Sequence, residues 1–321
     1  MKTAAEFAAF AEAAGVRVEK DCPLSPLSSF RIGGCAEYAL FPSTAEQLCT
    51  VVREADRRGV RCAVFGNASN VLFDDAGFEG AAVFCSALRK ISAEPTEGTV
   101  AAECGVSLRD LTLAAEENGL SGLEFAYGIP GSVGGAVYMN AGAYGGEMKD
   151  AVVSSTAYDR KTGEIITLHG EEHLFGYRDS FYLRGGDRYV ILGAVFSLKA
   201  DGRAEVRARM DDFLNRRKEK QPLNFPSAGS VFKRYPGYFT GKLIEEAGLK
   251  GRTVGGAQVS EKHAGFIVNR GGATAADVKA LVEIIREEVF RREGIRIECE
   301  IRFIPEKAEA RYRPDTGEAS S

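Results

Sequence analysis

Residues 125–146 read FAYGIPGSVGGAVYMNAGAYGG, a stretch with seven glycines in 22 residues. An amphipathic helix does not contain glycine at this density. Glycine has no Cβ, so it admits positive φ and lets a ligand lie directly against backbone N–H groups, and consecutive N–H groups form a concavity that binds anions. The stretch predicts a wall shaped for a large phosphate-bearing ligand. On local composition alone, the alternative is a glycine-rich surface loop.

Individual positions indicate how such a wall is built. The Ile-Pro-Gly sequence that begins at Ile129 predicts a turn, the pair Gly134 and Gly135 permits close approach, and Asn140 adds a side chain that both donates and accepts hydrogen bonds. The spacing fits neither G-x-G-x-x-G nor G-x-x-x-x-G-K-[ST], which disfavours a Rossmann or P-loop interpretation.

Composition narrows the function classes. A length of 321 residues predicts about two domains, which suits a ligand held between them. The net charge is −4 and no long basic run occurs, so nucleic acid is not an expected partner. The seven cysteines are scattered without a C-x-x-C pair. This pattern favours reduced thiols in a cytosolic protein over a disulfide framework or a zinc site, and no metal is expected.

The N-terminal region and the hydropathy bear on location. The alanine-rich residues 4–14 are interrupted by Glu6 and Glu12 and follow no basic region, so we interpret them as a helix of a soluble protein rather than a signal peptide. No apolar run approaches the roughly 20 residues that span a bilayer, and no membrane association is expected.

Capping and periodicity predict an α+β fold. Thr44 with Gln47, Ser107 with Asp110 and Thr274 with Asp277 are helix-starting pairs. The strand-rich first two-thirds lacks the regular alternation of a doubly wound parallel sheet. The expected helices end at Gly59, Gly119 and Gly294, with a fourth over residues 205–220; the expected strands are 60–65, 83–91, 99–103, 189–198 and 295–304, with a hairpin over 152–168.

Two further loops are candidates for ligand contact. Residues 66–70, GNASN, follow a predicted buried strand, where a second phosphate contact can form. Residues 221–237 combine small residues with the hydroxyl of Ser230 and the cations Lys233 and Arg234, which suggests a second anionic ligand.

Seven motifs together resemble those of the UDP-N-acetylenolpyruvoylglucosamine reductase family, in its compact subtype. Any one of them is weak, but all seven occur in family order over most of the chain. They are SSFRIGG (28–34), GNASNVL (66–72), GIPGSVGGAVYMNAGAYG (128–145), YRDS (177–180), PSAGSVFKR (226–234), VGGAQVSEKHAGFIVN (254–269) and ECEIRF (298–303).

The resemblance implies a fold of the vanillyl-alcohol-oxidase (PCMH) type, in which two α+β subdomains hold FAD and a third domain binds a nucleotide sugar. The corresponding division is an N-terminal helix over residues 1–22, an FAD-binding domain over 23–204, an α+β substrate-binding domain over 205–305 and a disordered tail over 306–321.

The resemblance also implies a reaction. NADPH reduces FAD, and the flavin then reduces UDP-N-acetylglucosamine enolpyruvate to UDP-N-acetylmuramate in cytoplasmic peptidoglycan precursor synthesis. By motif, Ser230 is the proton donor, while Arg178 and Glu300 stabilise an enolic carboxylate. Glu300 can help only if it is at least partly protonated, so we expect a raised pKa. His263 is more often structural in such a segment and is left out of the catalytic set.

Binding residues follow from the same motifs. Ala68 replaces a glycine of the family's phosphate loop, and Arg234 stands where the family often has asparagine. Lys233 and Arg234 are the expected substrate-binding residues. The expected cofactor-binding residues are Gly66, Asn67, Ala68, Ser69, Asn70, Gly128, Ile129, Pro130, Gly131, Gly134, Gly135, Asn140, Ala141, Gly142 and Ala143.

Two other functions fit the glycine-rich stretch. One is a different flavin oxidoreductase of the same fold that acts on a small hydroxy compound, which need not contain PSAGSVFKR or ECEIRF. The other is a sugar-nucleotide sensor without turnover. The joint presence of Arg178, Ser230 and Glu300 argues against the sensor.

Overall fold

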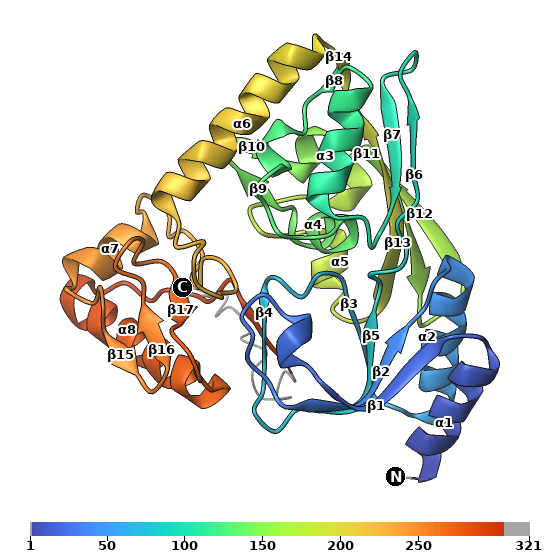
Figure 1. Cartoon of the computed structure of the whole chain (residues 1–321), viewed down its shortest axis with the longest axis horizontal. Coiled ribbons are helices and arrows are strands. Elements are labelled where there is room, and N and C mark those ends of the chain that lie inside the picture. The colour runs from blue at the N-terminus through green and yellow to red at the C-terminus, as the bar shows by residue number, and fades with distance from the viewer. Residues whose placement is uncertain (1, 305–321) are drawn as a thin grey trace, which may run out of the picture.

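The structure is a computed structural model that describes residues 2–304. Figure 1 shows a first sheet with α1 and α2, a second sheet with α3 to α6, and a C-terminal part around α8. The tail predicted at residues 306–321 lies outside the described residues. The helices in the described range are α1 (Lys2–Ala13), α2 (Ala45–Arg58), α3 (Leu108–Glu117), α4 (Val133–Met139), α5 (Phe181–Arg184), α6 (Arg203–Lys220), α7 (Thr240–Glu246) and α8 (Ala275–Glu293).

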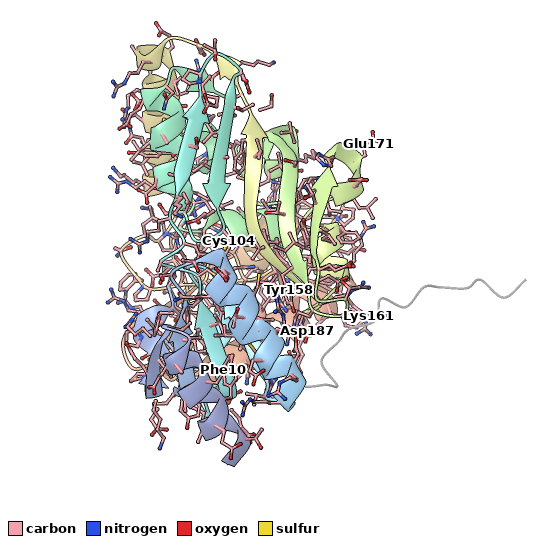
Figure 2. The ribbon with its side chains drawn as sticks, turned by 90° about the vertical axis from the view of Figure 1, so that its right-hand side faces the viewer. Phe10, Cys104, Tyr158, Lys161, Glu171 and Asp187 are labelled. Atoms are coloured by element: carbon pink, nitrogen blue, oxygen red, sulfur yellow. The ribbon has the colours of Figure 1, made fainter. Side chains whose placement is uncertain are left out.

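The first sheet has the order β1-β2-β5-β3. β1 pairs antiparallel with β2, and β5 pairs parallel with both β2 and β3. α1 and α2 lie side by side over this sheet (Figure 2). The bounds of these strands, with the neighbouring β4, are β1 (Arg17–Pro23), β2 (Cys35–Phe41), β3 (Cys62–Phe65), β4 (Val71–Phe73) and β5 (Phe78–Phe84).

The second sheet is antiparallel, with the order β12-β11-β13-β7-β6. Its strands are β6 (Ile91–Glu94), β7 (Thr99–Glu103), β11 (Val152–Asp159), β12 (Ile165–His169) and β13 (Tyr189–Ser197). Short strands β8 (Leu120–Ser121), β9 (Gly142–Ala143), β10 (Gly146–Glu147) and β14 (Lys199–Ala200) pair as β9 with β10 and β8 with β14.

Arg160 joins the two sheets. Its guanidinium makes an ion pair with Asp56 of α2 at 2.5 Å, and it donates to the carbonyl oxygens of Cys62 at 3.2 Å and Asp187 at 3.1 Å. Figure 2 shows Asp187 near the end of α2. Because a single planar cation satisfies three partners from both sheets, their relative orientation is fixed at this point.

The C-terminal part has its own apolar core. The antiparallel sheet β15 (Thr253–Val254), β16 (Ala257–Val259) and β17 (Ile267–Asn269) packs with α7 and α8. Phe30, Ile32 and Leu72, from the first third of the chain, belong to the same core. The C-terminal part is therefore anchored to the loops beside the first sheet by buried apolar contacts as well as by the chain itself.

The chain then returns to the first sheet. β18 (Arg302–Ile304) pairs parallel with β4, residue for residue from Arg302 opposite Val71 to Ile304 opposite Phe73. This pairing places the end of the described chain beside β4, the strand that directly follows the loop of residues 66–70.

Most predicted helices and strands are confirmed. Thr44 Oγ1 accepts from the Gln47 N–H at 3.1 Å and Gly59 is left-handed at φ +65°, as the capping signals of α2 require. The N-terminal helix predicted over residues 1–22 is shorter, because α1 ends at Ala13, Gly15 turns the chain at φ +77° and residues 17–23 are the edge strand β1.

Three other expectations need correction. The strand predicted over 83–91 is not one strand, because β5 ends at Phe84, β6 begins at Ile91 and the residues between them form a connection with a turn. Residues 295–304 alternate in burial as predicted, but only the last three pair with another strand. The glycine-rich stretch contains a seven-residue helix, α4, whose buried face is Val133, Ala136 and Val137.

α6 also lies elsewhere than expected. Arg203 and Arg207 bind the buried carboxylate of Glu116 in α3 at 2.7 Å and 2.9 Å, and Arg209 binds Glu124 at 2.8 Å. α6 is thus held against the second sheet's helices rather than within the C-terminal core. Within residues 2–304, no helix is both long and apolar enough to cross a membrane.

Candidate active site

One cavity of about 580 Å³ lies where the three parts of the fold meet. This volume falls within the range of about 300–1,000 Å³ typical of small-molecule sites. The loop of residues 66–70, most of the glycine-rich stretch, and Arg178, Ser230 and Glu300 all line it. The structure therefore brings together the three candidate catalytic residues, which are more than 50 residues apart in the sequence.

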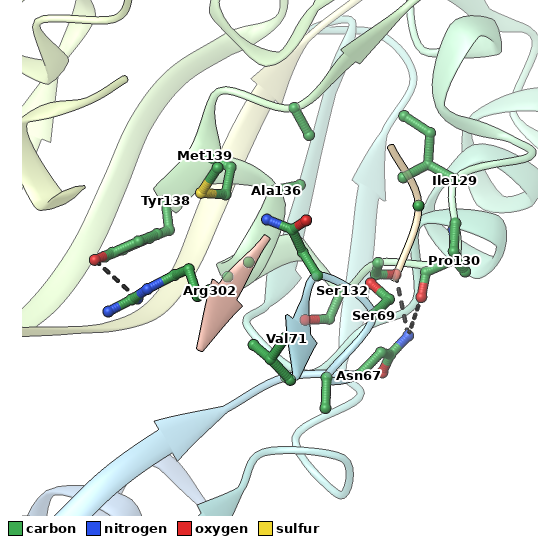
Figure 3. Close-up of a pocket in the computed structure, with 18 of the residues that line it drawn as sticks. Asn67, Ser69, Val71, Ile129, Pro130, Ser132, Ala136, Tyr138, Met139 and Arg302 are labelled. Atoms are coloured by element: carbon green, nitrogen blue, oxygen red, sulfur yellow. Dashed lines mark hydrogen bonds between the residues drawn. The ribbon is translucent and has the colours of Figure 1, made fainter. Parts of the chain in front are cut away.

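The two glycine-bearing loops are held together at the cavity wall. The Asn67 Nδ2 donates to the carbonyl oxygens of Pro130 at 3.2 Å and Gly131 at 3.1 Å (Figure 3). A Cβ added at Gly66 would lie 1.9 Å from the Ser132 Oγ. Glycine at position 66 is therefore required by the close approach of the two loops.

Ser132 is the N-terminal cap position of α4 and is 1% exposed. Its hydroxyl lines the cavity and has no hydrogen-bond partner among the described residues. A buried hydroxyl without a partner costs free energy, so a ligand atom that bonds to it is favoured. Gly134 lies two residues further along the chain, where its N–H donates to the Cys104 carbonyl at 2.8 Å and a Cβ would lie 2.9 Å from the Cys104 Cβ.

Arg178 and Glu300 form an ion pair inside the cavity. The Arg178 Nε donates to the Glu300 Oε1 at 2.6 Å, with the two side chains 18% and 13% exposed. The Arg178 Nη2 also donates to the Gly142 carbonyl at 3.2 Å. Burial raises the pKa of the Glu300 carboxyl, and the neighbouring Arg178 charge only partly opposes that rise. The predicted direction of the Glu300 pKa is confirmed.

Ser230 lies beside this pair. Its Oγ donates to the Phe232 carbonyl at 3.2 Å, and the hydroxyl lines the cavity. The next residue, Val231, accepts a hydrogen bond from the Glu300 N–H at 2.7 Å and donates to Gly265 at 2.8 Å. A backbone network thus fixes the position of the Ser230 hydroxyl relative to Glu300.

Comparison with known proteins identifies the family. Residues 36–169 match a model of an FAD binding domain, and residues 221–304 match that of the UDP-N-acetylenolpyruvoylglucosamine reductase C-terminal domain. A reductase of this name from Caldicellulosiruptor bescii is 44% identical over 316 residues, covering 98% of this chain and 99% of that protein. The chain belongs to the UDP-N-acetylenolpyruvoylglucosamine reductase family.

Other relatives agree. The reductase of Geobacillus kaustophilus is 44% identical over 90% of this chain and 94% of its own length. The crystal structure of the reductase from Thermus caldophilus is 34% identical, covers 90% of this chain and 100% of its own, and superposes with a TM-score of 0.76. The α+β architecture with an FAD-binding part is therefore that of the reductase family.

Four residues expected to bind ligands do not line the cavity: Gly128, Asn140, Lys233 and Arg234. Asn140 is fully buried, and its amide donates to Glu147 at 3.0 Å and to the Gly176 carbonyl at 2.8 Å. Gly176 begins the turn that carries Arg178, so Asn140 ties the glycine-rich stretch to that turn. Lys233 pairs with Glu298 at 3.3 Å, and Arg234 is exposed.

Several cavity residues were not predicted. The Arg302 Nη1 donates to the Tyr138 hydroxyl at 3.0 Å, and both residues line the cavity (Figure 3). The alternation of residues 295–304 places Arg302 on the same face as Glu300, and this pattern is the sequence signal that indicates Arg302. Ser132, His263 and Arg217 also line the cavity. His263 was predicted to be structural, and burial lowers the pKa of its imidazole.

The approach of the two loops makes a testable prediction at Gly66. Gly66→Ala should lower the melting temperature, since overpacking typically costs about 1–3 kcal/mol, and should displace Ser132. Differential scanning calorimetry measures this. Gly135→Ala is the matched control, because its Cβ would meet Ser132 Oγ at an ordinary 3.7 Å within α4. A Gly66→Ala protein as stable as the control would show that Ser132 moves aside freely.

Proposed function

We propose that this protein reduces UDP-N-acetylglucosamine enolpyruvate to UDP-N-acetylmuramate with NADPH, through bound FAD, in peptidoglycan precursor synthesis. The observation that carries the proposal is the meeting of Arg178, Ser230 and Glu300 in the cavity formed by the two glycine-bearing loops. The sugar nucleotide is the small-molecule partner. The proposed location is the cytoplasm, which suits the seven free cysteines.

The residues present fit FAD. The free Ser132 hydroxyl and the glycine-lined wall give a flavin's phosphates polar contacts and close access. When bound, FAD accepts a hydride from NADPH and delivers it to the enolpyruvyl double bond. The residues proposed to hold it are those expected positions that line the cavity: Gly66, Asn67, Ala68, Ser69, Asn70, Ile129, Pro130, Gly131, Gly134, Gly135, Ala141, Gly142 and Ala143.

Arg178 is proposed to bind the substrate carboxylate. Its guanidinium is permanently charged, and its planar group of N–H donors matches a carboxylate. The hydrogen bonds to Glu300 and Gly142 hold it in the cavity. Negative charge that grows on the carboxylate after hydride addition is stabilised there without reorganisation.

Glu300 is proposed to act in its protonated form. An ionised glutamate would repel an enolic carboxylate, whereas a carboxylic acid can donate a hydrogen bond to it. The raised pKa supports this role. When an anionic substrate binds Arg178, that guanidinium is shared, which favours proton retention on Glu300 still further.

Ser230 is proposed to protonate the substrate carbon. Its hydroxyl donates to the Phe232 carbonyl at 3.2 Å, and rotation about the Cβ–Oγ bond would turn the proton from that carbonyl toward a substrate in the cavity. Lys233 and Arg234 are proposed to contact the nucleotide part of the substrate outside the cavity. One hydrogen bond supports this for Arg234: its backbone N–H donates at 3.0 Å to the hydroxyl of Tyr177, the neighbour of Arg178 in the sequence.

The domain division is proposed in revised form. The FAD-binding part includes the first strand β1 and helix α6, because both pack on its sheets and helices. The substrate-binding part begins near residue 221, after the end of α6 at Lys220, and Ala228 is the first residue after that point in the C-terminal apolar core.

Purified protein should be yellow with about one FAD per chain. NADPH alone should reduce that flavin once, and continuous NADPH consumption should require the enolpyruvyl sugar nucleotide. Absorbance spectra, cofactor extraction and product mass spectrometry test this. A colourless protein that takes up no FAD would exclude the proposed function. NADPH oxidation that requires a small hydroxy compound instead would assign a different flavin reaction.

Ser230→Ala should leave flavin bleaching by NADPH unchanged and slow the recovery of flavin absorbance on substrate addition by about 10²–10⁴-fold, because a positioned acid is lost. Rapid-mixing spectroscopy separates the two phases. Ser230→Cys should recover part of the rate, and Ser227→Ala, in the same loop, should be native. Substrate-driven recovery at the native rate in Ser230→Ala would remove Ser230 from the mechanism.

Glu300 should impose a pH dependence. If its acid form is required, the substrate-driven phase should slow as pH rises through the raised pKa of Glu300 and be fastest below it. Glu300→Gln should lower this rate by about 10²–10³-fold and abolish that pH dependence, since glutamine does not titrate. Equal losses in both phases would indicate a structural or flavin-binding role.

A further inference from the structure

Three buried polar side chains form a hydrogen-bonded chain outside the active-site cavity. Ser155 of β11, His173 and Tyr182 of α5 are 1%, 0% and 0% exposed, and none of the three lines the cavity. The Ser155 Oγ lies 2.7 Å from the His173 Nε2 and 2.6 Å from the Tyr182 hydroxyl oxygen. The His173 Nδ1 lies 2.9 Å from the Gly170 carbonyl oxygen. These bonds connect β11 to two later segments of the chain.

The direction of each hydrogen bond follows from the chemistry of the groups. A carbonyl oxygen only accepts, so the His173 Nδ1 carries the ring proton and donates to Gly170. In a neutral imidazole the Nε2 then accepts, so the Ser155 hydroxyl donates to it, and the Tyr182 hydroxyl must donate to Ser155. Burial favours these states, because it lowers the pKa of His173 and raises the pKa of Tyr182 to about 12. The chain therefore has one arrangement of protons, and a network satisfied in this way is rigid.

The hydrogen-bonded chain closes the base of one loop. We call residues 173–182 the arginine loop, because Arg178 lies in it. His173 and Tyr182 are its two ends, and both bond to the Ser155 hydroxyl. β11 is paired with a strand on each side, so Ser155 stands in the interior of the second sheet. A single hydroxyl on a fixed strand thus holds the two ends of the loop together.

The arginine loop contains two strained residues. Leu174 and Arg178 have φ of +49° and +52°, a left-handed conformation that residues other than glycine disfavour. Such strain persists where surrounding contacts over-determine it. Gly176 and Asp179 exchange two backbone hydrogen bonds and Asn140 donates to the Gly176 carbonyl, so the middle of the loop is held. Leu174 is 49% exposed, so its strained backbone depends on the attachment of the residue before it.

We propose that Ser155 is a positioning residue, which fastens both ends of the arginine loop to β11 and so places the Arg178 guanidinium. In that place the Arg178 Nε donates to the Glu300 Oε1 at 2.6 Å. A misplacement of about 1 Å, caused by a mutation far from the chemistry, can lower a rate by about 100-fold. The inference rests on the proposed function for the task of Arg178 at the substrate carboxylate.

The test uses FAD-loaded protein with Ser155→Ala or Tyr182→Phe. Ser155→Ala should slow the substrate-driven recovery of flavin absorbance by about 10–100-fold, while FAD content and bleaching by NADPH stay within about twofold of native. Tyr182→Phe keeps the ring and leaves no buried donor unpaired, so its loss should be smaller, and it provides the same comparison if Ser155→Ala does not fold. Ser154→Ala, on the opposite face of β11, is the control and should be native.

A double variant separates positioning of Arg178 from general support of the fold. Arg178→Met has no guanidinium to place, so adding Ser155→Ala to it should slow the substrate-driven phase by less than about twofold more. If Ser155 only supported the fold, its effect would not pass through Arg178, and the two losses would multiply.

Hydrogen exchange tests the attachment of the loop without turnover. The amides of Gly176 and Asp179 should exchange at least about 10-fold faster in Ser155→Ala, whereas the paired amides of β11 and β13 should keep their native rates.

Four results would overturn the inference. They are a native substrate-driven rate in Ser155→Ala, equal losses in both flavin phases, losses that multiply with Arg178→Met, and native exchange at Gly176 and Asp179. Faster exchange in a protein whose native form shows no substrate-driven phase would reject the proposed reaction and leave the attachment of the arginine loop to Ser155 standing.

Discussion

The parallel pairing of β18 with β4 is the constraint on which the site depends. Arg302 N–H donates to the Asn70 carbonyl at 3.0 Å, and the Asn70 Nδ2 donates to the Glu300 carbonyl at 3.2 Å. These two bonds attach the end of the described chain to the loop of residues 66–70. They add to the bond from the Glu300 N–H to Val231 and help to place Glu300 beside Arg178, which comes from the middle of the sequence. The charge pair is therefore a consequence of topology, since no local motif contains both residues.

The sequence predicted well the features that local physics determines. Helix caps depend on a few adjacent residues, so α2, α3 and α8 begin as expected at Thr44, Ser107 and Thr274. The last strand was predicted too long for a reason that is not local. Ile295 and Ile297 are buried in the C-terminal core, which produces the alternation, but a strand also needs a partner, and β4 is only three residues long.

The sequence indicated which types of residue form the site better than it indicated which of them face the cavity. Asn140 and Gly128 belong to the glycine-rich stretch, but neither lines the cavity. Asn140 is fully buried, and Gly128 makes room for the Arg217 side chain. Composition cannot distinguish a glycine that admits a ligand from one that admits a side chain of the same protein. Conversely, nothing in the sequence RRKEK at residues 216–220 distinguishes Arg217 from the charges around it, because only tertiary packing buries this side chain.

Backbone strain gathers where the cavity walls meet. Ala68, Tyr144 and Arg178 line the cavity and have φ between +44° and +54°, a conformation that costs a non-glycine residue about 1–2 kcal/mol. Arg178 keeps this conformation because Gly176 and Asp179 exchange two backbone hydrogen bonds and Asn140 holds the Gly176 carbonyl. The turn therefore holds Arg178 in a backbone conformation that arginine disfavours, and in that conformation its charged side chain lines the cavity. Strain of this kind persists only where the surrounding contacts over-determine it, and here those contacts come from the same glycine-rich stretch that forms the cavity wall.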